Sequence, residues 1–114
     1  MNKIERSLVE VGVPASLSGF QYLVEAIDLS GKNRDLLRHI TKGLYPSVAE
    51  KHKTTATRVE RAMRHAIEVA FTNSEGLDIR KKYFGNTIPC STGKPTNSEF
   101  IAMMVLNVRD QTDA

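Results

Sequence analysis

Apolar side chains recur along most of this chain at the spacing of an α-helix, and one segment shows the pattern most clearly. Residues 54–71 read TTATRVERAMRHAIEVAF. At 100° per residue, one side of this segment is a continuous apolar stripe of Val59, Ala62, Met63, Ala66, Ile67, Val69 and Ala70. The other side is polar, with Arg61, Arg64, His65 and Glu68 at its centre and Arg58 and Glu60 at its margins. The pattern predicts a helix with one face for burial and one for a partner.

The same spacing predicts several shorter helices. Apolar positions and the turn residues between them place helices at residues 2–11, 19–29 and 77–84. A further pattern over residues 36–48 is interrupted by Pro46, and proline resists the interior of a helix but suits its first turn. We therefore expect a boundary or a kink near Tyr45, a short helix over residues 46–51 and a turn over residues 52–55.

The C-terminal part of the chain combines a loop and a last helix. Residues 86–95 are dense in Gly, Pro, Ser and Thr, which predicts an ordered loop that Ile88 would hold to the core. Thr96 and Glu99 have the spacing of a capping box, so we expect a last helix from there to about Val108. The polar residues after it are expected to fray. Because strand patterns are nearly absent, the predicted fold is all-α, an irregular bundle of about six helices.

Length and composition limit the class of protein. The chain has 114 residues, which suits one compact domain, and its 40% apolar share is enough for one core. Cys90 is the single cysteine, so a disulfide within the chain and a cysteine-rich metal site are both excluded. With no apolar run of membrane-spanning length and no signal peptide, a reducing cytoplasm is the expected location.

The charge of the chain is concentrated in one window. The net charge is only +3, but residues 32–65 carry nine Lys or Arg against three Asp or Glu. The residues on either side of this window are slightly acidic. A localised basic field favours a polyanion as partner, although a solvated basic face would have the same composition.

The order of elements in this window is that of a helix-turn-helix: a short helix, a tight turn and a longer helix with outward arginines. Such a motif needs a small residue where the second helix crosses the first, and Ala49 is placed for that. It also needs an apolar residue that faces back, and Val59 lies ten positions further on. Lys53 stands where the turn often has glycine, so a positive φ there would strain a side chain.

Three arginines on the polar face are candidates for DNA contact. Arg58, Arg61 and Arg64 could each donate to O6 and N7 of guanine or bind a phosphate. The alternative is exposed arginines that pair along the helix, for example Arg64 with Glu60. Three arginines within seven residues favour DNA.

Two further residues on this face have open alternatives. Glu60 could accept a hydrogen bond from N4 of cytosine, or it could cap the helix, because Thr57 and Glu60 have capping-box spacing. If Thr55 is the N-cap instead, Glu60 is free to read DNA. His65 could donate to a base or a phosphate, or bond to its own helix. The predicted base-reading set is Arg58, Glu60, Arg61, Arg64 and His65.

Polar residues around the turn are candidates for phosphate contact, and helix capping is the alternative for the threonines among them. One lysine further along the chain joins them. The predicted set is Lys51, Lys53, Thr54, Thr55, Thr57 and Lys94.

No pattern in the chain predicts catalysis. His39, His52 and His65 are evenly spaced, but no acidic cluster accompanies them. Cys90 has no histidine beside it, and the STGK at residues 91–94 lacks the glycines of a P-loop. We expect no catalytic residue, no metal site and no cofactor. The alternative to DNA binding is a non-enzymatic helical module whose arginine-rich face docks an acidic protein.

Four stretches of the chain resemble one family. They are TTATRVERAMRHAIEVA, VGVPASLSGFQYLVEAI, ITKGLYPSVAEKHKTTA and KPTNSEFIAMM. They are similar to the C-terminal effector domain of stage-zero sporulation protein A, the master response regulator of sporulation in endospore-forming bacteria. The resemblance covers nearly the whole chain.

The resemblance implies a six-helix effector domain of a two-component system that binds double-stranded DNA at TGTCGAA-like boxes and regulates transcription. By position, the base-reading set matches the family's recognition helix, here residues 55–71. The resemblance also implies a contact with the sigma subunit of RNA polymerase through Gly76, Phe84 and Ile88, and a homodimer on tandem boxes. Residues 1–114 are expected to be a single effector domain without the family's receiver domain, either a fragment of a longer protein or a stand-alone relative. This domain is expected to associate with the bacterial nucleoid and not with a membrane.

Overall fold

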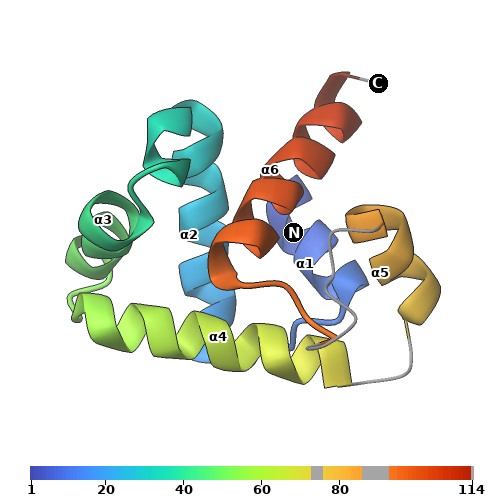
Figure 1. Cartoon of the computed structure of the whole chain (residues 1–114), viewed down its shortest axis with the longest axis horizontal. Helices are drawn as coiled ribbons and strands as arrows, with labels where there is room; N and C mark the ends of the chain where they lie inside the picture. The colour runs from blue at the N-terminus through green and yellow to red at the C-terminus, as the bar shows by residue number, and fades with distance from the viewer. Residues whose placement is uncertain (73–75, 86–92, 114) are drawn as a thin grey trace.

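The computed structural model describes residues 1–72, 76–85 and 93–113, with side chains as far as residue 108. These residues form six α-helices and no β-strand, which confirms the predicted all-α fold (Figure 1). The helices are α1 (Lys3–Val11), α2 (Ser18–Lys32), α3 (Tyr45–Lys51), α4 (Ala56–Thr72), α5 (Leu77–Phe84) and α6 (Asn97–Asp113). A 3₁₀-helix, η1 (Arg34–Leu37), and a π-helix, η2 (Ile40–Leu44), lie between α2 and α3.

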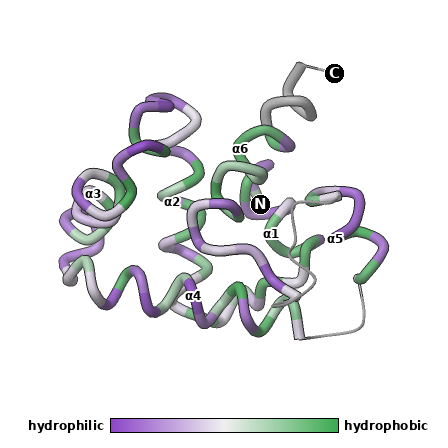
Figure 2. Tube along the Cα trace, viewed as in Figure 1, coloured by the Kyte–Doolittle hydropathy of each residue, from purple (hydrophilic) through white to green (hydrophobic). Residues whose placement is uncertain are grey.

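The core lies where α2 meets α4 and α6. Figure 1 shows α4 along one edge of the molecule, with α2 crossing it and the first turn of α6 above it. Each α-helix contributes at least one side chain that is at most 2% exposed: Leu8, Phe20, Val48, Met63, Phe84 and Phe100 in chain order. Along α4, apolar and polar positions alternate with the helical period (Figure 2). Its apolar stripe is therefore the side that enters the core, as predicted.

The crossing of α2 and α4 depends on a glycine. A Cβ atom added to Gly19 would lie 2.2 Å from the carbonyl oxygen of Ala62 and 2.9 Å from the Cβ of Ala66. The first of these neighbours is backbone, which cannot move aside alone. The two helices can therefore approach this closely only because residue 19 has no side chain.

The connection before α3 differs from the prediction. The helical pattern predicted from residue 36 onward is not one α-helix but the short segments η1 and η2. In η2 the carbonyl of His39 accepts from the N–H groups of both Gly43 and Leu44, at 2.7 and 3.0 Å, which widens the turn. The boundary predicted near Tyr45 is confirmed, because α3 begins there and Pro46 occupies its first turn.

The last helix is longer than predicted. The capping box is confirmed, since Thr96 donates its N–H to Glu99 Oε1 at 2.9 Å and Glu99 donates its N–H to Thr96 Oγ1 at 3.2 Å. The end predicted near Val108 is wrong, because α6 continues to Asp113 with no Gly or Pro to stop it. Ile88 and the loop predicted over residues 86–95 lie largely outside the described residues. Within the described ranges, no helix is both long and apolar enough to cross a bilayer.

Candidate nucleic-acid interface

The helix-turn-helix consists of α3, a turn and α4. The turn is closed by two backbone bonds: His52 donates to the carbonyl of Val48 at 3.1 Å, and Thr54 donates to that of Ala49 at 2.9 Å. Ala49 is 4% exposed, so the small residue predicted at the crossing is buried. Lys53 has a φ of 54°, the only positive φ outside glycine in the described residues. The strain expected at the missing glycine is therefore present.

The N-cap of α4 is Thr55. Arg58 donates its backbone N–H to Thr55 Oγ1 at 3.2 Å, and Val59 donates to the Thr55 carbonyl at 3.0 Å. This decides between the two caps that the sequence left open. Thr57 lies inside the helix, and Glu60 is not part of a capping box.

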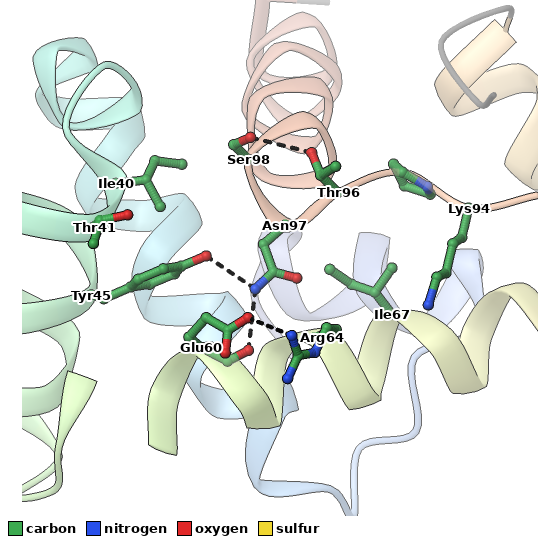
Figure 3. A pocket seen from close by; sticks show the side chains of 11 residues that line it. Ile40, Thr41, Tyr45, Glu60, Arg64, Ile67, Lys94, Thr96, Asn97 and Ser98 are labelled. Carbon is green, nitrogen blue, oxygen red and sulfur yellow. Dashed lines mark hydrogen bonds and ion pairs between the residues drawn. The ribbon is translucent and has the colours of Figure 1, made fainter. Parts of the chain in front are cut away.

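The five predicted base-reading residues fall into two groups around α4. Arg58, Arg61 and His65 are all exposed, and they lie within about 60° of one another around the helix axis, opposite the buried stripe. We call these three residues the outer stripe. Glu60 and Arg64 lie on a neighbouring flank of the helix, which we call the α6 flank because it faces the first turn of α6 (Figure 3).

The α6 flank is already paired within the chain. Arg64 Nη1 lies 3.1 Å from Glu60 Oε1, and the two side chains are 53% and 31% exposed. The alternative of pairing along the helix is thus the observed one for these two residues. A guanidinium has five N–H donors, so the pair leaves donors of Arg64 for another partner.

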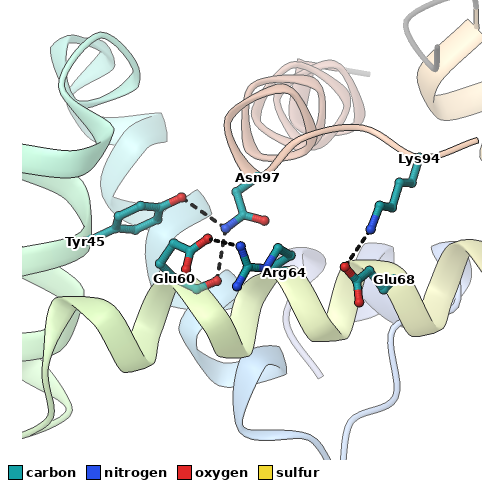
Figure 4. Close-up of polar contacts among 6 residues, drawn as sticks. All are labelled: Tyr45, Glu60, Arg64, Glu68, Lys94 and Asn97. Atoms are coloured by element: carbon teal, nitrogen blue, oxygen red, sulfur yellow. Dashed lines mark hydrogen bonds and ion pairs between the residues drawn. The ribbon is translucent and has the colours of Figure 1, made fainter. Parts of the chain in front are cut away.

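A cleft of about 430 Å³ opens beside this flank, lined by residues of η2, α3 and α4 and by residues 94–98 (Figure 3). Tyr45 forms one wall, and burial raises the pKa of its phenol, so this side chain is neutral at physiological pH. Asn97 Nδ2 donates to Tyr45 Oη at 3.0 Å and to the carbonyl of Glu60 at 3.2 Å (Figure 4).

Two of the predicted phosphate contacts already have carboxylate partners. Lys94 Nζ lies 2.6 Å from Glu68 Oε1, and this hydrogen bond lowers the pKa of Glu68 (Figure 4). Lys51 Nζ lies 2.9 Å from Glu25 Oε1, and the pKa of Lys51 is raised mainly by that hydrogen bond. Lys53 is exposed at the tip of the turn. Of the lysines in the set, Lys53 is therefore the best placed for a phosphate.

The threonines of the phosphate set differ in exposure. Thr55 and Thr57 are exposed, whereas Thr54 is half-buried. The Thr55 hydroxyl accepts the capping bond, which leaves its own proton for donation to another group.

The two predicted sigma-contact residues that the structure describes, Gly76 and Phe84, differ in exposure. Gly76 is exposed and precedes α5 with a φ of 79°. Phe84 is 1% exposed, and its ring centroid lies 5.4 Å from those of both Phe71 and Phe100. The Phe84 ring therefore belongs to an aromatic cluster in the core and is not itself exposed to a partner. Ile88 lies outside the described residues.

The bonds of Asn97 are the part of this site that sequence reasoning missed. Its partners Tyr45 and Glu60 are 52 and 37 residues away along the chain. The capping box shows that a helix starts at Asn97, but no local pattern shows what the side chain meets. Among the described residues, no group of three or more His, Cys, Asp and Glu side chains is placed to hold a metal ion.

A comparison with protein families gives one match that bears on this interface. The family described as "Sporulation initiation factor Spo0A C terminal" matches residues 4–108. The match includes both helices of the helix-turn-helix, the outer stripe and the α6 flank. It agrees with the resemblance noted in the sequence.

Proposed function

This chain belongs to the family of Spo0A C-terminal domains, and from that premise we propose that α4 is the recognition helix that reads a specific DNA sequence. The family is one of DNA-binding effector domains that regulate transcription in sporulation. The observation that carries the proposal is the outer stripe, two arginines with forked donors and a histidine, all exposed on the side of α4 opposite its buried residues. A helix of this kind fits the major groove of B-form DNA.

The two groups of side chains have different proposed roles. Arg61 lies near the centre of the outer stripe and donates to O6 and N7 of a guanine, with Arg58 and His65 beside it. Arg64 reads a second guanine from the α6 flank, and Glu60 accepts from N4 of a cytosine. A TGTCGAA-like box contains both bases, which suits arginines beside a glutamate.

The proposed phosphate contacts lie around the turn. Lys53 and the hydroxyls of Thr55 and Thr57 are exposed there and bind phosphates directly. The charges of Lys51 and Lys94 are already offset by the carboxylates of Glu25 and Glu68, so we expect a smaller contribution from each.

Two partners of the bound domain are also proposed. Gly76 is exposed, and Leu77 beside it is 51% exposed at the start of α5, which supports a contact there with the sigma subunit of RNA polymerase. Leu106 on α6 is 44% exposed, which supports a homodimer on tandem boxes through α6. The setting of these contacts is the nucleoid in the bacterial cytoplasm.

Selection of bound sequences from a random duplex pool tests the proposal directly. We expect the selected duplexes to converge on a TGTCGAA-like box, with affinity that falls as salt rises. Recovery of no preferred sequence would contradict the proposal. Negligible affinity even for random DNA at low salt would favour the alternative, a module whose arginines dock an acidic protein.

A further inference from the structure

We propose that Asn97 is a positioning residue for DNA recognition: its side chain holds α3 and α4 at one angle and thereby sets which bases α4 selects. Asn97 is the first residue of α6 and lies outside both helices of the motif. The inference rests on the proposed reading of DNA by α4, and it assigns to α6 a part in selectivity that needs no contact with DNA.

The geometry of the amide carries the inference. Asn97 Nδ2 donates to Tyr45 Oη on α3 at 3.0 Å and to the carbonyl oxygen of Glu60 on α4 at 3.2 Å (Figure 4). An amide nitrogen has two hydrogen atoms, so both bonds can exist at the same time. One nitrogen atom therefore connects the two helices of the motif to each other.

The amide is itself held in place by the rest of α6. The capping box of Thr96 and Glu99 sets the direction in which the helix starts, and Asn97 is its first residue. Phe100 and Ile101, one turn further on, are both 0% exposed and anchor the helix in the core. The position of the nitrogen is thus determined by packing remote from the turn.

The bond to α4 falls at the turn that carries the α6 flank. The carbonyl that accepts from Asn97 belongs to Glu60, whose carboxylate pairs with Arg64 at 3.1 Å. A forked contact to a base has hydrogen bonds of about 2.7–3.2 Å, so a small rotation of α4 is enough to break it. Loss of the amide would therefore misplace several base contacts together, while contacts to phosphates persist.

The chain offers a matched control on the same helix. Asn107 is also part-buried, and its Nδ2 donates to two carbonyls, that of Tyr83 at 3.0 Å and that of Met103 at 2.8 Å. The bond to Tyr83 ties α6 to α5, the bond to Met103 lies within α6, and neither reaches the helix-turn-helix. Asn107→Ala therefore removes the same chemistry from the same helix without touching α3 or α4.

The test is the ratio of affinities for the selected duplex and a random duplex, measured for Asn97→Ala and Asn107→Ala beside thermal unfolding. We expect Asn97→Ala to lower this ratio about tenfold and to weaken selection at more than one base position, with affinity for the random duplex unchanged. We expect Asn107→Ala to lower the unfolding temperature similarly and to leave the ratio within about twofold.

Tyr45→Phe provides a second variant that removes only one partner of the amide. We expect Tyr45→Phe to lower the ratio of affinities about threefold. When it is added to Asn97→Ala, we expect almost no further change in the ratio. An unchanged ratio in Asn97→Ala, or an equal fall in Asn107→Ala, would overturn the inference. If Asn97→Ala does not fold, an unchanged ratio in Tyr45→Phe overturns it as well. A wild-type protein with no preferred duplex would instead refute the reading of DNA by α4.

Discussion

The inner and outer sides of α4 belong to one helix but have opposite surroundings. On the inner side Val59, Met63 and Ala66 are all 0% exposed, and Gly19 brings the backbone of α2 against Ala62. On the outer side Arg58, Arg61 and His65 are exposed. Substitutions on the inner side should therefore change the stability of the fold, and those on the outer side should change DNA recognition alone.

The α6 flank is intermediate between these two sides. Its residues Glu60 and Arg64 are part-exposed, yet they are held by each other and, through the backbone, by Asn97. A substitution there should affect both recognition and the geometry of the motif. Substitutions on the inner and outer sides of α4 therefore separate effects on stability from effects on DNA recognition most clearly.

Met63→Ala should have the largest effect on stability. Its side chain is 0% exposed at the centre of the inner face, and removal of a buried Met side chain costs about 2–5 kcal/mol in the free energy of unfolding. Chemical denaturation measures this loss. At a temperature where the variant is folded, its preference for the selected duplex should equal that of the wild type, and an altered preference would show that the inner side of α4 also contributes to DNA recognition.

Gly19→Ala should be nearly as damaging. The added Cβ would meet the carbonyl oxygen of Ala62 at 2.2 Å, so α2 and α4 must separate, with a loss of about 3 kcal/mol in the free energy of unfolding. Gly31→Ala in the same helix is the control, because a Cβ there meets nothing within 4 Å. That control should gain up to about 1 kcal/mol. Equal stabilities for the two variants would show that α2 does not limit the position of α4.

Arg61→Ala should act only on DNA. Loss of a forked contact to guanine is expected to cost about 1–3 kcal/mol of binding free energy at one base position, with the unfolding temperature unchanged. Quantitative binding to duplexes substituted one position at a time locates the effect. Arg6→Ala on α1 is the control for the loss of one charge. Equal losses of Arg61→Ala on specific and random DNA would refute its role in base reading.

Lys53→Gly should have the smallest effects. It should make the fold more stable and weaken the binding of DNA. Glycine relieves the positive φ of 54° and should raise the free energy of unfolding by about 1 kcal/mol. Loss of the ammonium should weaken binding to all sequences alike and reduce the salt slope by roughly one. Lys53→Ala keeps the strain but loses the same charge, so the two variants should bind DNA equally and differ in stability. A change in sequence preference would count against a phosphate contact.

Local patterns in the sequence predicted most of the helices. The apolar stripe of α4, the capping box at Thr96 and the boundary at Pro46 are each set by residues within a few positions of one another. The segment before α3 was not predicted correctly, because the choice among α, 3₁₀ and π turns depends on packing against other helices. The capping alternatives at Thr55 and Thr57 likewise needed the structure.

Short-range patterns along the chain were enough to locate the polar side of α4, the helix-turn-helix and the family resemblance, because helical period, turn chemistry and motifs each depend on residues that are close together in the chain. Packing between distant segments placed Glu60 and Arg64 beside α6, brought Lys51 and Lys94 to carboxylates, and buried Phe84. It also brought Asn97 to both helices of the motif. These contacts join residues from 13 to 52 positions apart, so their geometry is fixed only when the core packs.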